Sequence, residues 1–187
     1  MNDPRDRIPL AYHEAGHAVT AYWLGHQFAS EGVWITPDGQ LTDGSAGRAV
    51  SRRPEESPSP AKERVMMVLA GHLSAHRWMV VSHGERKARE WHENGGPAPF
   101  TKDEFLEAYF GACLDVDSSV EVRDDWKLAA MMVGGELDTA NNERSLNRFK
   151  ARCARYQSET LKQLANPLVW RSVCKIATKQ ANHSWAV

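Results

Sequence analysis

The chain contains 187 residues, and its 23 Lys and Arg residues are nearly balanced by 24 Asp and Glu residues. The basic residues are scattered along the chain, so no positively charged surface for DNA or RNA is indicated and a nucleic-acid partner is excluded. The longest apolar run, VMMVLAG at residues 65–71, is far shorter than the ~20 residues that a membrane span requires, and the polar N-terminus lacks a signal-peptide pattern. We therefore expect residues 1–187 to form a single soluble domain with no membrane partner.

The three cysteines also bear on the location of the protein. Cys113, Cys153 and Cys174 occur singly and are widely spaced. This spacing suits reduced thiols better than a disulfide framework or a zinc site built from cysteines. The pattern favours a cytoplasmic protein.

The first part of the chain predicts one helix followed by two short strands. Pro9 fits the first turn of a helix, apolar residues then keep helical spacing, and Gly25 offers a stop. A short strand that ends in the turn sequence PDG is predicted at 31–37, and a second strand at 47–50. The sequence therefore predicts a small β-sheet or hairpin near residues 31–50.

The rest of the chain is predicted to be helical. The polar, proline-rich segment 51–60 should be a loop, and a helix should follow at about 60–81. After a second loop, Thr101 and Glu104 have the spacing of a capping box at the start of another helix. Further helices are predicted at about 117–133, 137–165 and 167–182. These elements predict a mainly α domain of the α+β class.

The stretch AYHEAGHAV, residues 11–19, lies on the first predicted helix. His13 and His17 would project from the same helix face one turn apart, so their imidazole nitrogens can meet at one point with Glu14 beside it. A hydrolytic zinc site needs about three protein ligands, an open position for water, and a base that takes the proton of that water. The pattern His-Glu-x-x-His supplies two Zn²⁺ ligands and the general base, and small Ala15 and Gly16 are expected to leave room for metal and substrate.

This stretch resembles the zinc-site helix in the peptidase domain of the FtsH-type ATP-dependent metalloproteases. VWITPDG, residues 33–39, is similar to the strand and turn that follow that helix in the family. ERVMMVLAGHLSAHR, residues 63–77, is similar to the family's next helix, with Ala70 and Gly71 where a glycine pair is usual. In coarse order the likeness covers most of the chain, and residues 1–40 match at motif strength. The resemblance implies a helical zinc metallopeptidase domain.

In that family the third zinc ligand is an aspartate near the start of a later helix, in a pattern like Ser/Asn-Asp-Leu-x-x-Ala. DDWKLAA, residues 124–130, is similar, with Asp125 followed by Trp126 and then Ala129. The resemblance therefore implies Asp125 as the third ligand, and Asp124 is the second choice because it would shift the alanine out of register. The alternative is a pair of acids that only favours the N-terminal region of a helix.

The chain departs from the family after Gly71, where it reads HLSAHR in place of an Arg-Ala-Ala-Glu-Glu run. A carboxylate that could orient a ligand is thus missing from the pattern. The stretch up to Asp125 is also longer than in the family, which indicates an insertion around residues 83–117; a lid, a partner-docking surface and plain surface elaboration all stay open. His72 and His76 form another i, i+4 pair, for which a solvated or core-edge position is favoured over contact with the first site.

The family's ATPase motor and membrane anchor have no counterpart in this sequence, which contains no G-x-x-x-x-G-K-[ST] loop and no membrane span. The implied function is an ATP-independent zinc endopeptidase whose flexible or unfolded substrates arrive by diffusion or from a separate motor partner. Val33, Trp34 and Ile35 would hold an extended peptide if their strand edges the cleft. The alternatives are a non-catalytic metal-binding or scaffold protein derived from a peptidase, and a zinc hydrolase of small amides. The sequence leaves the oligomeric state open, a homo-oligomer included.

Overall fold

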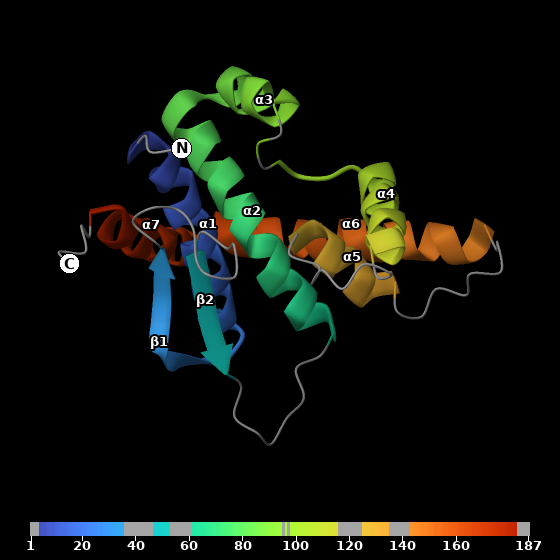
Figure 1. Cartoon of the computed structure of the whole chain (residues 1–187), viewed down its shortest axis with the longest axis horizontal. Coiled ribbons are helices and arrows are strands. Elements are labelled where there is room, and N and C mark those ends of the chain that lie inside the picture. Colours follow the sequence, from blue (N-terminus) through green and yellow to red (C-terminus); the bar gives the residue numbers. More distant parts are fainter. Residues whose placement is uncertain are drawn as a thin grey trace.

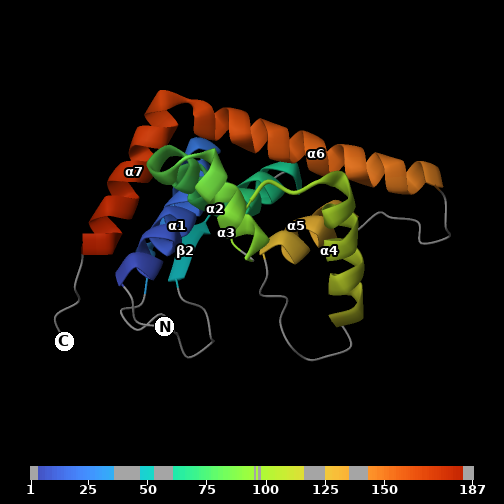
Figure 2. The same ribbon diagram turned by 90° about the horizontal axis from the view of Figure 1, so that it is seen from above.

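The structure is a computed structural model, and it describes residues 4–35, 47–52, 61–94, 96, 98–115, 125–134 and 143–182. Figures 1 and 2 show α1 and α2 side by side, with α6 and α7 meeting at an angle and enclosing them on one side. The elements follow the order α1 (Pro4–Trp23), β1 (Gln27–Ile35), β2 (Gly47–Arg52), α2 (Ala61–His83), α3 (Glu85–Glu93), α4 (Lys102–Asp115), α5 (Asp125–Gly134), α6 (Glu143–Ala165) and α7 (Pro167–Asn182).

The first helix is longer than the sequence predicts. It begins at Pro4, so the predicted start near Pro9 is wrong. Pro9 lies within the first two turns of α1. A proline there removes one main-chain hydrogen bond and disrupts the helix less than it would in the middle. The predicted stop is confirmed, because Gly25 has a φ of 83° and the N–H of His26 donates to the carbonyl of Ala21 at 3.0 Å. This is the usual glycine cap of a helix C-terminus.

The two strands form one antiparallel ladder, whose register is irregular between Phe28 and Val33. The α+β class that the sequence predicts from a small β-sheet near residues 31–50 is nevertheless wrong. In the described residues this ladder is accompanied by helices alone. A lone two-stranded ladder is marginally stable in water and depends on what it packs against, so the helices alone define the fold class, which is mainly α.

The contact between α1 and α2 determines where the two histidines of α1 lie. A Cβ atom on Gly16 would lie 2.4 Å from the carbonyl oxygen of Ala70 and 2.4 Å from Oγ of Ser74. Gly16 thus allows the two helices to approach closely. The expectation that it leaves room for metal and substrate is wrong, because the space beside Gly16 is filled by α2.

Aromatic side chains join α1 and α2 to α7 on another side of the bundle. The ring of Tyr12 stacks on Trp78 with centroids 5.6 Å apart and packs against Trp170 at 5.8 Å. The guanidinium of Arg77 lies 4.7 Å from the centroid of the Trp170 ring, within the range of a cation–π contact. Burial raises the pKa of Tyr12 to about 12, so its hydroxyl stays neutral in this cluster.

The predicted helices of the second half are found, and the predicted starts near 117 and 137 lie outside the described residues. The capping box is confirmed: the N–H of Thr101 donates to Oε2 of Glu104 at 2.7 Å, and the N–H of Glu104 donates to Oγ1 of Thr101 at 3.3 Å. The bounds of α7 agree with the prediction, and Oδ1 of Asn166 caps its first turn by accepting from the N–H of Leu168 at 2.9 Å. No helix in the described ranges is long and apolar enough to cross a membrane.

Helix α4, within the proposed insertion around residues 83–117, packs against the helix that carries Asp125. Phe105 and Tyr109 of α4 belong to the buried cluster. The ring of Tyr109 fills the space beside Gly134 at the end of α5, where a Cβ atom would lie 2.2 Å from a ring carbon. Part of the segment proposed as an insertion is therefore core, and it packs against α5.

The α1–α2 contact predicts the effect of one added methyl group. Gly16→Ala should improve helix propensity by about 1 kcal/mol and yet lower the free energy of unfolding by about 1 to 2 kcal/mol net, because the new Cβ meets a backbone oxygen that cannot move aside cheaply. Urea denaturation followed by circular dichroism measures the change. Tyr22→Ala is the control, because that side chain on the same helix is 68% exposed; a Gly16→Ala variant as stable as the wild type would contradict the close contact.

Candidate metal centre

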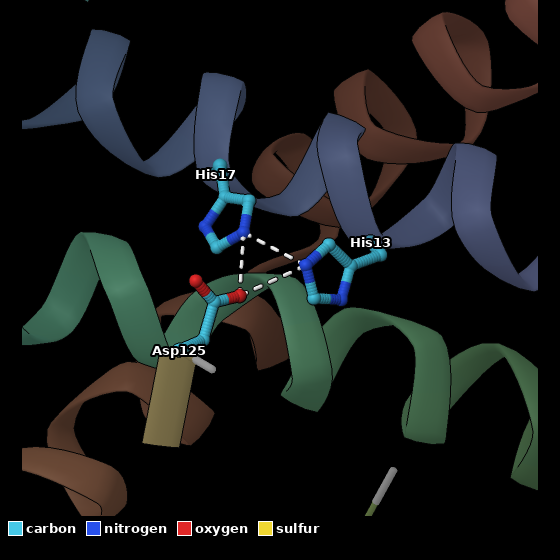
Figure 3. Close-up of side chains that lie close together, drawn as sticks. All are labelled: His13, His17 and Asp125. Carbon is cyan, nitrogen blue, oxygen red and sulfur yellow. Dashed lines mark hydrogen bonds and ion pairs between the residues drawn. The ribbon is translucent and has the colours of Figure 1, made fainter. Parts of the chain in front are cut away.

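Three side chains from α1 and α5 converge on one point, as Figure 3 shows. The Nε2 atoms of His13 and His17 lie 3.0 Å apart. Oδ2 of Asp125 lies 2.9 Å from Nε2 of His13 and 3.0 Å from Nε2 of His17. The structure thus brings together all three residues that the sequence analysis names as ligands. Asp124, the second choice, lies outside the described residues.

The three side chains are neither fully buried nor freely solvated. The exposed fractions are 19% for His13, 18% for His17 and 24% for Asp125. Asp125 is the first residue of α5, where the partial positive charge of a helix N-terminus favours a carboxylate. Part of each of the three side chains is therefore accessible to solvent.

A main-chain hydrogen bond fixes the orientation of His17. Its Nδ1 lies 2.7 Å from the carbonyl oxygen of Met67 on α2. A carbonyl oxygen only accepts, so Nδ1 carries the proton, and in the neutral ring the lone pair is on Nε2 and faces the cluster. This is the tautomer that a metal ligand needs.

The protonation of the cluster follows from its crowding. Burial lowers the pKa of His13 to about 4, so this ring is neutral near pH 7. Burial also acts to lower the pKa of His17, but the charge and hydrogen bond of Asp125 outweigh it and raise the pKa to about 9. Burial alone would raise the pKa of Asp125; the charge of His17 and hydrogen bonds from the histidines hold it well below its usual range. Without metal, one proton on His17 holds the electron-rich atoms together.

The backbone of α2 forms the floor of the cluster. A Cβ atom on Gly71 would lie 2.4 Å from Nε2 of His17 and 2.8 Å from Nε2 of His13. Any side chain at this position would push into the imidazoles. Gly71 therefore leaves room for the imidazole ligands, whereas the sequence led us to expect that Gly16 leaves room for metal and substrate.

Glu14 lies next to the first ligand in the sequence but is far less exposed. Its side chain is buried, with 6% exposed. Burial raises the pKa of Glu14 to about 7; the charge of Asp125 adds to the rise and that of His17 opposes it. A carboxyl group with a pKa near 7 can both accept and return a proton at neutral pH.

Two further groups from the sequence analysis have different outcomes. His72 reaches the cluster, with its Nδ1 3.5 Å from Oδ2 of Asp125 and its ring centroid 4.9 Å from that of His13. His76 does not belong to the group of candidate ligands. The backbone of Val33, Trp34 and Ile35 lies in β1, paired with β2, and their side chains are outside the described part.

The donor set fits zinc. Zinc binds imidazole nitrogen at ~2.0–2.1 Å and carboxylate oxygen at ~2.0–2.2 Å, and two histidines with one carboxylate leave a position for water in its hydrolytic sites. The absence of a side chain at Gly71, which leaves room for the two imidazoles, and the partial exposure of the three side chains agree with such a site. Comparison with family models, curated proteins and solved structures gives no match for this chain.

Gly71 offers a way to disturb the cluster without removing a ligand. In Gly71→Ala the imidazole ends can rotate away from the new Cβ, so the chain should fold, but the nitrogens should no longer meet. We expect at least a ~10-fold higher dissociation constant for Zn²⁺, the scale seen when groups that orient ligands are changed. Competition with a chromophoric chelator measures it.

Ser82→Ala is the matched control, because Ser82 is an exposed residue near the end of the same helix. It should bind Zn²⁺ as the wild type does. Unchanged affinity in Gly71→Ala would mean that the imidazoles do not bind metal at this point.

Proposed function

We propose that the protein is a zinc-dependent endopeptidase in which His13, His17 and Asp125 bind Zn²⁺ and Glu14 is the general base. The observation that carries this proposal is the convergence of Nε2, Nε2 and Oδ2 within 3.0 Å of one another, with a buried carboxyl group next in sequence to the first ligand. A pure metal-binding site has no use for Glu14. A hydrolytic site needs such a base within reach of its water.

Each of these residues would have a separate role in hydrolysis. When bound, zinc lowers the pKa of a water molecule and polarises the carbonyl group of the substrate. Glu14 would accept the proton of the attacking water, which its raised pKa permits near pH 7, and would then give it to the leaving amine. The hydrogen bond from Nδ1 of His17 to Met67 would keep the ligand nitrogen facing inward throughout.

The proposed substrates are flexible or unfolded polypeptides. The resemblance of the His13–His17 helix to the FtsH-type peptidases supports this class, and β1 offers a backbone to which an extended peptide could add. This chain has no phosphate-binding loop of the G-x-x-x-x-G-K-[ST] type, so we propose ATP-independent hydrolysis, with substrates that diffuse in or are delivered by a separate motor. The proposed location is the cytoplasm, which its three dispersed cysteines favour.

Two other functions use the same cluster. A non-catalytic scaffold derived from a peptidase would bind zinc and leave peptides intact. A small-amide hydrolase would cleave amides of low molecular weight and leave casein intact. The presence of Glu14 favours a hydrolase over a scaffold. The resemblance to the FtsH-type peptidases favours peptides over small amides as substrates.

The role of Glu14 can be separated from metal binding. Glu14→Gln should retain one Zn²⁺ per chain and lose at least ~100-fold in peptide hydrolysis, because the amide keeps the size of the side chain and cannot take a proton. Asp125→Ala is the contrasting variant and should lower zinc occupancy itself. Elemental analysis and cleavage of a quenched fluorescent casein measure the two effects. Unchanged activity in Glu14→Gln would remove Glu14 from the mechanism.

The substrate class predicts a dependence on substrate folding. A domain stable by ~5 to 15 kcal/mol exposes its interior too rarely for fast cleavage by an enzyme that cannot pull on it. The protein should cut casein and a destabilised variant of a small domain, and spare the stable parent domain, with no effect of ATP. Gel analysis of the parent and variant with and without ATP tests this. Failure to cut either substrate by fully zinc-loaded protein would favour the scaffold, and cleavage of small amides alone would favour the amide hydrolase.

A further inference from the structure

The third ligand has a histidine neighbour to which the zinc-binding motif gives no role. Nδ1 of His72 lies 3.5 Å from Oδ2 of Asp125, the same oxygen atom that faces both histidine ligands. The His72 ring packs with its edge toward the ring of His13, at an interplanar angle of 64°. One residue of α2 thus touches ligands from two different helices.

The position of His72 follows from that of Gly71. The backbone of α2 comes closest to the imidazoles of α1 at Gly71, where a Cβ would collide with them. The next residue on a helix points about 100° further round. This rotation takes the side chain of residue 72 from the imidazoles of α1 to the carboxylate at the start of α5.

We propose that His72 is a positioning residue for Asp125, whose carboxylate it holds toward the metal by donating a hydrogen bond from Nδ1–H to Oδ2. The inference rests on the proposed zinc site. The sequence after Gly71 lacks the carboxylate that could orient a ligand. In this proposal His72 takes that role, and its imidazole acts on the carboxylate ligand. A carboxylate can bind a metal with one lone pair of an oxygen and accept a hydrogen bond with another.

The geometry of His72 favours a role in positioning Asp125 over direct binding of the metal. The ligand atoms of His13, His17 and Asp125 lie within 4.8 Å of one another, and His72 is not part of that group. The side chain of His72 is 21% exposed, a fraction between those of the ligands, and its ring lies against His13 and beside Asp125. A side chain there can also stop Asp125 from turning toward water, since Asp125 is itself 24% exposed. Loss of the proposed hydrogen bond should therefore weaken zinc binding while leaving the ligand count unchanged.

Two substitutions separate the hydrogen bond from the ring packing. His72→Phe keeps a ring against His13 and removes the donor, whereas His72→Asn removes the ring and keeps an N–H near the place of Nδ1. We expect the dissociation constant for Zn²⁺, measured by chelator competition, to rise ~10- to 100-fold in His72→Phe and to stay within about 3-fold of wild type in His72→Asn. His76→Phe, the same change one turn along α2, should bind zinc as the wild type does.

X-ray absorption at the zinc edge counts the imidazole ligands independently of activity. Two imidazoles in both the wild type and His72→Phe would support the proposal. Three in the wild type would overturn it by making His72 a ligand, and equal zinc affinity in wild type and His72→Phe, or weakening in His72→Asn alone, would overturn it too. Wild-type protein that binds no zinc would overturn the proposed function as well, whereas a zinc-loaded, active wild type with an unaffected His72→Phe variant would overturn this inference alone.

Discussion

The candidate site depends on one electrostatic constraint: three electron-pair donors face each other at 2.9–3.0 Å. Two imidazole nitrogens and a carboxylate oxygen repel one another unless a positive charge lies between them. In the metal-free chain a proton on His17 meets this need, because the charge and hydrogen bond of Asp125 outweigh burial and raise the pKa of His17. A divalent cation meets the same need with twice the charge, so metal binding and release of the proton are expected to be coupled.

The fold supplies the packing that sustains this arrangement. Gly16 allows α2 to approach α1, and Gly71 on α2 then lies directly beneath the imidazoles. On the other side α4 packs on α5 through Tyr109 and Gly134, which fixes the helix that begins with Asp125. Two helices that carry ligands and two helices that brace them thus form one structural unit, although Asp125 is far from His13 in the sequence.

The sequence predicts the local features better than the contacts between helices. The His-Glu-x-x-His spacing, the Gly25 stop and the Thr101–Glu104 capping box are set by helix periodicity and by side chains a few residues apart, so each can be recognised in a short window. The roles of Gly16 and Gly71 could not be separated, because a small residue shows that something is close without showing what. The hydrogen bond from His17 to Met67 leaves no trace in the sequence, since every residue type has a carbonyl group.

The fold class shows the same limit at a larger scale. Short apolar runs at 31–37 and 47–50 predict strands, and the step to an α+β class assumes that they build a layer of the core. In the described residues these runs form one two-stranded ladder and every other element is a helix, so the helices decide the class. Asp125 was found by its resemblance to a family pattern, which carries information about distant contacts that periodicity does not.

The carbonyl group of Met67 has a consequence for how the protein tolerates mutation. Because the main chain holds the tautomer of His17, most side chains that fit within α2 could stand at position 67 without changing the ligand. Position 71 has no such freedom, since every side chain other than hydrogen enters the imidazole space. Two positions one helical turn apart that serve the same histidine should thus differ sharply in the variation they accept, and the position with the more conspicuous side chain is the permissive one.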